Sequence, residues 1–223
     1  ASLGLKVILT MPESISLERR SVLSAYGAEV VLTPAETGMK GAIEAAQKIA
    51  SETPRAFMPD QFSNPGNPWA HQVTTGPEIV ADLKGRGIAA FVAGVGTGGT
   101  LTGVGRIVKA AFPDAQVIAV EPQKSAVLSG ESAGRHAIEG IGAGFVPKNL
   151  DLSIIDRVVQ VPDEAAMEMA RLLARKEGLF VGISAGANVW AAMALAREIE
   201  GNIVTVSPDR GDKYLSTAAF KTS

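Results

Sequence analysis

Apolar and polar positions follow two different periods along this chain of 223 residues. Short β-branched runs predict strands at 5–10, 29–33, 57–60, 88–95, 116–121, 157–161, 179–183 and 202–207. Apolar residues at helical spacing predict helices at 17–26, 41–51, 69–84, 101–111, 162–176 and 188–199. Strands that alternate with helices predict an α/β fold in which mostly parallel, twisted sheets carry helices on both faces.

The stretch that joins the predicted strand at 88–95 to the helix at 101–111 is rich in glycine and threonine. It reads GVGTGGTLTG from Gly94 to Gly103. A strand, a glycine-rich turn and a helix N-terminus together present several backbone N–H groups to an anion. Glycine also lets the main chain approach a ligand closely, because no Cβ stands in the way. We interpret this turn as a phosphate-binding site rather than a simple connection.

The kind of phosphate is open at this point. Gly94, Gly96 and Gly99 formally match the fingerprint of dinucleotide-binding proteins, and Glu121 ends the next predicted strand, where an acid that binds a ribose belongs. A nicotinamide-dependent oxidoreductase is therefore one hypothesis. Ligands of parallel sheets bind at the carboxyl ends of strands, so we expect the turn and Ser184 to meet at one site.

Composition narrows the functional classes. The formal net charge is −2 and 20% of the residues are charged, so we expect neither nucleic acid nor an anionic membrane as a partner. No apolar run reaches about 18 residues, so no transmembrane helix is expected. The absence of cysteine excludes thiol chemistry. His71 and His136 lie far apart in the sequence, so we expect no metal site, and we interpret His71 as structural and His136 as part of a surface rim.

Seven phrases that stand in order resemble the cysteine synthase (O-acetylserine sulfhydrylase) family of fold-type II pyridoxal-phosphate enzymes. They are LTMPE, QFSNP, TTGPEI, GVGTGGTLTGV, GIGAGF, GISAG and YLST, starting at Leu9, Gln61, Thr74, Gly94, Gly140, Gly182 and Tyr214. The resemblance covers essentially the whole chain. It implies a two-domain architecture similar to the tryptophan synthase β subunit, with residues 1–64 in the smaller, mobile domain and residues 65–223 in the larger, cofactor-binding domain.

The resemblance implies roles for individual residues. The pyridoxal 5′-phosphate (PLP) phosphate would be held by Gly96, Thr97, Gly98, Gly99 and Thr100. Ser184 would bind the pyridine nitrogen of PLP, Gln61 the carboxylate of the substrate, and Gly140 and Ile141 would lie over the bound amino acid.

The family's Schiff-base lysine, and a loop that grips the substrate carboxylate, lie N-terminal to the region that this chain resembles. None of the ten lysines stands in that lysine motif. We therefore expect no catalytic residue in this chain, which resembles the C-terminal three-quarters of the family's enzymes with the N-terminal part missing. A catalytically dead homologue that binds serine acetyltransferase is the alternative.

The resemblance implies a transferase that makes L-cysteine from O-acetyl-L-serine and sulfide by β-replacement. Alternatives within the family are O-phosphoserine sulfhydrylase and cystathionine β-synthase. The resemblance further implies a homodimer, serine acetyltransferase as a partner, and a cytoplasmic location, with an organelle left open.

Overall fold

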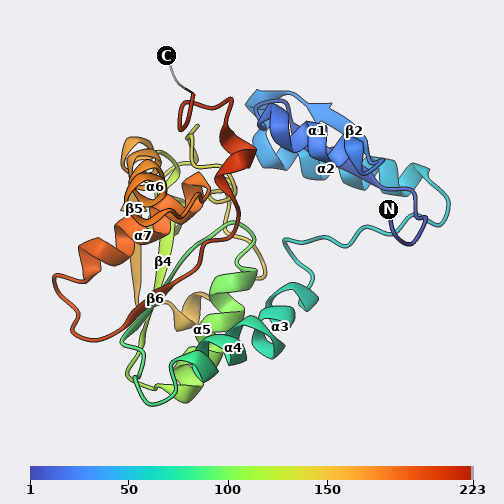
Figure 1. Ribbon diagram of the computed structural model, residues 1–223. Helices are drawn as coiled ribbons and strands as arrows, with labels where there is room; N and C mark the ends of the chain where they lie inside the picture. Colours follow the sequence, from blue (N-terminus) through green and yellow to red (C-terminus); the bar gives the residue numbers. More distant parts are fainter. Residues whose placement is uncertain (222–223) are drawn as a thin grey trace. The chain divides into compact units, whose positions relative to one another are not determined.

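A computed structural model describes residues 1–221 and divides into two compact units (Figure 1). The first unit joins Ala1–Pro59 to residues 212–221, and the second spans Asp60–Gly211. The domain boundary that we expect after residue 64 stays a prediction. Within residues 1–221, no helix combines the length and the apolar character that crossing a membrane requires.

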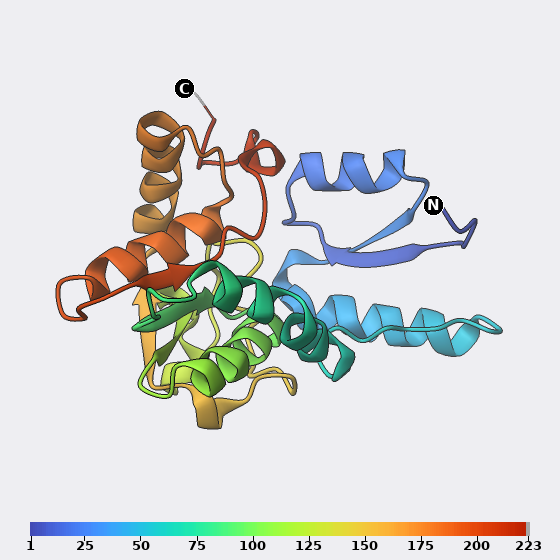
Figure 2. The same cartoon turned by 60° about the horizontal axis from the view of Figure 1, so that its bottom comes forward.

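The first unit is built on two parallel strands. Its elements are β1 (Ile8–Pro12), α1 (Leu17–Ala25), β2 (Glu29–Thr33), the 3-10 turn η1 (Ala35–Thr37) and α2 (Gly38–Glu52). The strands pair in a register that places Ile8 opposite Glu29. Figure 2 shows α1 and α2 on opposite sides of this pair. The Thr10 hydroxyl fastens α2 to β1 by donating to the Ala42 carbonyl at 2.7 Å.

The segment near the C-terminus also belongs to the first unit. It includes most of the 3-10 turn η5 (Gly211–Tyr214). Ser216 donates from its backbone and its hydroxyl to the two carboxylate oxygens of Glu18, each at 2.7 Å. These hydrogen bonds hold the pKa of Glu18 below its ordinary value. Arg19 adds a hydrogen bond of 2.9 Å to the Tyr214 hydroxyl, so α1 anchors the segment at two neighbouring residues.

The second unit is a parallel sheet with helices on both faces. Its helices and strands are α3 (Gly66–Val73), α4 (Thr75–Asp82), β3 (Ala90–Gly94), α5 (Gly99–Ala111), β4 (Gln116–Pro122), β5 (Arg157–Val161), α6 (Asp163–Glu177), α7 (Ile183–Leu195) and β6 (Ile203–Thr205). It also has 3-10 turns η2 (Gln123–Ser125), η3 (Val127–Ser129) and η4 (Leu152–Ile154). Figures 1 and 2 show α3, α4 and α5 on one face of the sheet and α6 and α7 on the other.

The strand order of this sheet is β5-β4-β3-β6, with every described pair parallel. The chain therefore moves from β3 outward to β5 and returns to the other side of β3. Such a reversal places a ligand crevice at the carboxyl ends of the two strands that flank it, here β3 and β6. Phe91 and Val92 of β3 are fully buried, as expected for a central strand covered on both faces.

Two segments differ from the sequence-based expectation. Residues 57–60 form no strand, and the run at 179–183 forms only an isolated antiparallel bridge between Val181 and Arg210. Leu179 and Phe180 are 53% and 40% exposed, so their apolar character does not reflect a buried strand. The helix that we expect from residue 188 begins at Ile183 instead, which brings Ser184 into the first turn of α7.

A single long helix at 69–84 was also the wrong expectation. The backbone turns at Thr74, where φ is −124° and ψ is −83°, and divides the segment into α3 and α4. The turn lets α4 approach α5 at Gly76, where an added Cβ would lie 2.9 Å from the Ile107 side chain. The remaining strands and helices of the prediction lie where they were expected, with ends shifted by a few residues.

Candidate functional site

The glycine-rich turn lies at the carboxyl end of β3, beside the point where the strand order reverses. Gly98 precedes α5 with a φ of +81°, a left-handed conformation that glycine adopts without strain. Its neighbour is the backbone of Leu150, 2.9 Å from where a Cβ would lie. A Cβ on Gly96 would collide with the carbonyl oxygen of Gly140. Glycine is therefore needed here because two other backbone segments touch the turn.

Two N–H groups of the protein donate hydrogen bonds to the Thr97 hydroxyl and orient it. Its oxygen accepts the Asn67 side-chain amide at 2.9 Å and, at a longer 3.4 Å, the Gly99 backbone N–H. With two donors on the oxygen, the hydroxyl proton points elsewhere and is free to donate to a ligand. The N-terminus of α5 adds unpaired backbone N–H groups and a partial positive charge. This end of the helix therefore suits an anion that accepts several hydrogen bonds.

The predicted residue Gln61 lies beside this turn. Its backbone carbonyl accepts the side-chain amides of Asn67 and Asn149, each at 2.8 Å. Asn67 therefore bridges Gln61 and Thr97 with one amide group. The Gln61 side chain itself is exposed. The backbone of Gln61 is thus fixed while its side-chain amide remains available to a substrate.

The loop that carries Gly140 and Ile141 lies against both the glycine-rich turn and the first turn of α7. Ile141 is 8% exposed, and its side chain lies 2.7 Å from where a Cβ on Gly94 would stand. Gly140 has a φ of +96°, and a Cβ there would lie 3.8 Å from the Ser184 hydroxyl. The structure therefore brings together the predicted residues of the turn, the Gly140 loop and Ser184.

Ser184 and Asn188 lie one turn apart on α7 and both face this site. Ser184 is 4% exposed. Asn188 donates to the Val206 carbonyl at 2.9 Å, whereas its buried side-chain oxygen has no partner among the described residues. This oxygen would lie 3.2 Å from a Cβ on Gly94. The neutral Ser184 hydroxyl suits a neutral acceptor such as a ring nitrogen.

His136 holds the Gly140 loop rather than facing a ligand. Its Nδ1 accepts the Ile138 backbone N–H at 3.2 Å, so the ring proton of a neutral imidazole stands on Nε2. That Nε2 then donates to the Gly142 carbonyl at 2.9 Å. The contact fixes the backbone that follows Gly140 and agrees with the non-catalytic interpretation of this histidine.

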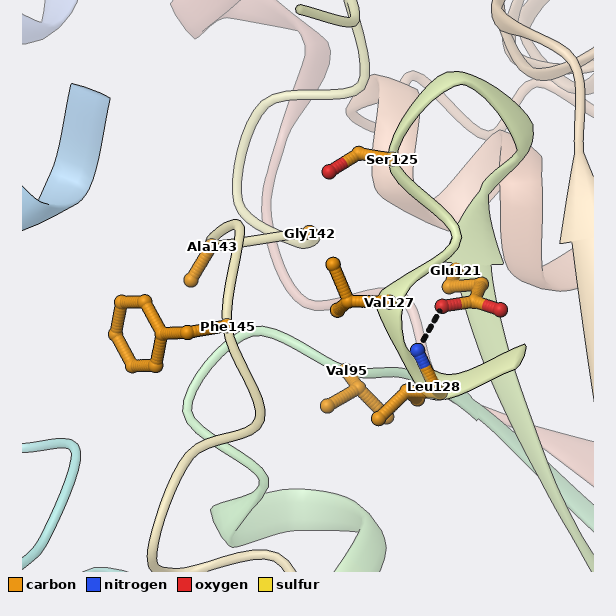
Figure 3. Close-up of a pocket in the computed structure, with 8 residues that line it drawn as sticks. All are labelled: Val95, Glu121, Ser125, Val127, Leu128, Gly142, Ala143 and Phe145. Atoms are coloured by element: carbon orange, nitrogen blue, oxygen red, sulfur yellow. Dashed lines mark hydrogen bonds between the residues drawn. The ribbon is translucent and has the colours of Figure 1, made fainter. Parts of the chain in front are cut away.

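A small cavity lies beside the turn and has room for about one water molecule. Figure 3 shows its lining by Val95, Glu121, Ser125, Val127, Leu128, Gly142, Ala143 and Phe145. The Glu121 carboxylate is 1% exposed and accepts the backbone N–H groups of Leu128 and Ser129 and the Ser129 hydroxyl. Because η3 uses both carboxylate oxygens, Glu121 does not serve as the ribose-binding acid of a nicotinamide site.

Several residues that build this site were not predicted. They are Asn67, Asn149 and Asn188, together with Thr102, whose hydroxyl donates to the Asn149 carbonyl at 2.9 Å. Asn67 stands four residues before His71, which contacts Thr100 at 3.1 Å. That spacing on a helix was the signal in the sequence, but the expected helix began at residue 69 and left Asn67 outside it, whereas α3 begins at Gly66.

Comparison with known proteins gives consistent results. A family described as pyridoxal-phosphate dependent enzymes matches residues 1–209. The chain is 48% identical over 222 residues to a cysteine synthase of Staphylococcus aureus, covering 99% of this chain and 71% of that protein.

Two solved structures extend this likeness to the fold. A cysteine synthase of Entamoeba histolytica matches with a TM-score of 0.90 and 38% identity, over 100% of this chain and 66% of that one. An O-acetylserine dependent cystathionine β-synthase of Helicobacter pylori matches with a TM-score of 0.92 and 40% identity, over 98% of this chain and 72% of that one.

Proposed function

The chain belongs to the family of pyridoxal-phosphate dependent enzymes, and from this membership we propose that the intact protein makes L-cysteine from O-acetyl-L-serine and sulfide. Its relatives support PLP-dependent β-replacement as the reaction class. The choice of donor rests on two of them, since one neighbour is named cysteine synthase (OASS) and another O-acetylserine dependent. The family match also removes the nicotinamide-dependent alternative.

The residues of the glycine-rich turn fit the phosphate of PLP. The phosphate would be held by backbone N–H groups at residues 96–100 and by the hydroxyls of Thr97 and Thr100. The orientation of the Thr97 hydroxyl is the observation that carries this assignment. Its oxygen already accepts the Asn67 amide at 2.9 Å, so its proton is directed to a ligand. Gly96 lies so close to the Gly140 carbonyl that a side chain would not fit at this position of the glycine-rich turn.

Ser184 would bind the ring nitrogen of PLP. When bound, the cofactor withdraws electrons from the substrate and so eases loss of the α-proton and of the leaving group on the β-carbon. A neutral serine hydroxyl leaves the ring nitrogen largely unprotonated, which limits this withdrawal. Acetate is a good leaving group, so its elimination needs only a weak electron sink. The residue type at 184 therefore matches elimination from O-acetylserine.

Substrate contacts are assigned to Gln61, Gly140 and Ile141. The exposed Gln61 amide would donate to the carboxylate of the amino acid, and its fixed backbone keeps the side chain near Thr97. Gly140 and Ile141 lie between the turn and Ser184 and would cover the bound substrate. The covalent anchor of the cofactor is assigned to none of the ten lysines of this chain.

The test is an assay, with PLP, O-acetyl-L-serine and sulfide, of purified protein that includes the segment carrying the family's Schiff-base lysine, which none of the ten lysines of this chain supplies. We expect L-cysteine and acetate in equal amounts, and little product when O-phospho-L-serine replaces the donor. Gln61→Ala should raise the KM for O-acetylserine while the affinity for PLP stays the same. Gln116→Ala is the matched control, because Gln116 stands at the amino end of β4, opposite the site.

The outcomes separate the alternatives. Faster turnover of O-phospho-L-serine would reassign the donor, and cystathionine formation from homocysteine in preference to cysteine from sulfide would reassign the acceptor. Bound PLP without any product would instead identify a catalytically dead homologue. We also propose a homodimer and binding of the serine acetyltransferase C-terminal tail near Gly140. Sedimentation of the protein alone and with that tail peptide tests both.

A further inference from the structure

Helix α3 presents two polar side chains to the first turn of α5. Asn67 and His71 are four residues apart and therefore lie on the same face of α3. Asn67 contacts Thr97 at 2.9 Å and His71 contacts Thr100 at 3.1 Å. α3 approaches closely because Gly103 has no side chain, since a Cβ there would collide with the Pro68 carbonyl. Each proposed phosphate-binding threonine is thus met by one residue of the same helix.

The direction of the Asn67 contact is fixed by chemistry, since an amide nitrogen only donates. The His71 contact has two directions, because a neutral imidazole donates from one nitrogen and accepts at the other. Burial lowers the pKa of His71 and favours this neutral ring. If Nε2 accepted the Thr100 proton, Thr100 would have none to offer a phosphate. The tautomer of His71 therefore decides whether Thr100 serves the site.

The surrounding hydroxyls select the tautomer. Thr74 donates its proton to the Ala70 carbonyl at 2.7 Å, so it has none for its neighbour. Thr75 lies 3.0 Å from His71 Nδ1 and 3.5 Å from the Thr74 hydroxyl. The shorter distance favours donation from Thr75 to Nδ1, which leaves the ring proton on Nε2. Nε2 then donates to Thr100, whose own proton is free.

We propose that His71 is a positioning residue that fixes the Thr100 hydroxyl as a donor to the phosphate of PLP. The inference rests on the proposed function, because Thr100 is assigned to the phosphate there. It adds that α3 orients both threonines, through Asn67 and through the chain of donation from Thr75 to His71 to Thr100. A histidine that sequence alone marks as structural thereby contributes to cofactor affinity without touching the cofactor.

The test compares the affinity of variants for PLP and for pyridoxal, which lacks the phosphate, by equilibrium dialysis of the whole protein. His71→Asn keeps a polar group near Thr75 but does not reach Thr100, and should weaken PLP binding about fivefold. His71→Gln places an amide donor near the position of Nε2 and should restore affinity to within about twofold. Thr100→Val should weaken PLP binding about tenfold. Pyridoxal affinity should stay constant throughout.

The double variant His71→Asn/Thr100→Val is the decisive measurement. If His71 acts through Thr100, the double variant binds PLP as weakly as Thr100→Val alone. Additive losses, an equal loss of pyridoxal affinity, or no rescue by His71→Gln would overturn the inference. If the unsubstituted protein does not prefer PLP to pyridoxal, the phosphate assignment of the proposed function fails instead. Circular dichroism of each variant separates these effects from misfolding.

Discussion

Helices α5 and α7 are both 13 residues long and both begin at the candidate site, yet their first turns offer different chemistry. α5 follows a strand and is preceded by Gly98 in the left-handed region, and the hydroxyls near its start belong to Thr97, which precedes the helix, and to Thr100 in its first turn. α7 follows an irregular segment and opens with buried residues, among which Ser184 is the hydroxyl. The first arrangement suits a charged acceptor with several lone pairs, and the second suits one neutral acceptor.

The neighbours of the two helices differ in the same way. α3 packs on α5 and supplies Asn67 and His71, which occupy the threonine oxygens. α6 packs on α7 at Gly186, where a Cβ would collide with the Ala166 carbonyl. The neighbour of α5 therefore contacts the threonine hydroxyls with polar side chains, whereas the contact of α6 with α7 at Gly186 is close packing against backbone.

The largest expected effect comes from separating each helix from its neighbour. Gly103→Ala and Gly186→Ala place a Cβ against backbone of α3 and α6, and each should lower the free energy of unfolding by up to about 3 kcal/mol. Gly103→Ala should also weaken PLP binding without affecting pyridoxal, because α3 orients the threonines. Gly186→Ala should weaken the binding of PLP and of pyridoxal to the same extent. Urea unfolding and equilibrium dialysis measure the two effects.

An equal loss of affinity for PLP and for pyridoxal in Gly103→Ala would contradict the assignment of the phosphate to α5 and of the ring nitrogen to α7. It would mean that the position of α5 as a whole, and not the orientation of its threonines, is what α3 provides.

The next effect concerns the turn before α5. Gly98→Ala combines an unfavourable φ of +81° with a Cβ 2.9 Å from Leu150 backbone atoms. Gly85→Ala is the matched control, because Gly85 has a φ of +84° with open space around it. The control should cost about 1 kcal/mol of unfolding free energy, and Gly98→Ala about 2 kcal/mol more. Similar losses of unfolding free energy in the two variants would show that Leu150 moves aside easily and does not constrain the glycine-rich turn.

Removing single hydroxyls gives a smaller and more selective effect. Thr97→Val should weaken PLP binding about tenfold and leave pyridoxal unchanged, because a hydrogen bond to a charged phosphate is lost. Ser184→Ala should weaken PLP and pyridoxal equally, by about threefold, because a bond to a neutral ring nitrogen is lost. Dialysis with both ligands distinguishes these patterns. A phosphate-specific loss in Ser184→Ala would reverse the assignment of the two helices.

The two helices also differ in how far the sequence predicts them. The turn before α5 was predicted from local chemistry, because a β-branched strand, a glycine-rich turn and an apolar helix succeed one another within one stretch. The start of α7 was misplaced by five residues. The apolar run from Leu179 mimics a buried strand, and no capping side chain marks Gly182 as the start.

The contacts that orient the site could not be predicted from the sequence, for a different reason. Asn67 and His71 have meaning only once α3 stops at Thr74 and packs on α5 at Gly103. Glu121 shows the converse, since its position after a strand matched a ribose-binding acid while the fold uses it to hold η3. Local patterns predict which backbone segments can bind an anion, and tertiary packing decides which side chains remain free to do so.

The smallest effect is a dependence on pH that involves the neighbour of α5. Burial lowers the pKa of His71 below its ordinary value of 6.5, so the unfolded chain takes up a proton at a higher pH than the folded protein does. Below about pH 6.5 the unfolded state therefore binds more protons, and the free energy of unfolding falls as the pH drops toward the folded pKa. The stability linked to His71 is present above this window and lost within it.

His71→Gln removes the titrating ring but keeps a donor for Thr100, so its unfolding free energy should decline less between about pH 7 and pH 5. Ser184→Ala should keep the full decline, because α7 does not depend on His71. Glu18 and Asp151 contribute little in this range, because hydrogen bonds lower the pKa of both carboxyls below ordinary values of 4.5 and 3.8. Equal slopes for His71→Gln and the unsubstituted protein would mean that the pKa of His71 is the same in the folded and unfolded states. Burial would then not favour the neutral ring, and the selection of one neutral tautomer next to α5 would lose this support.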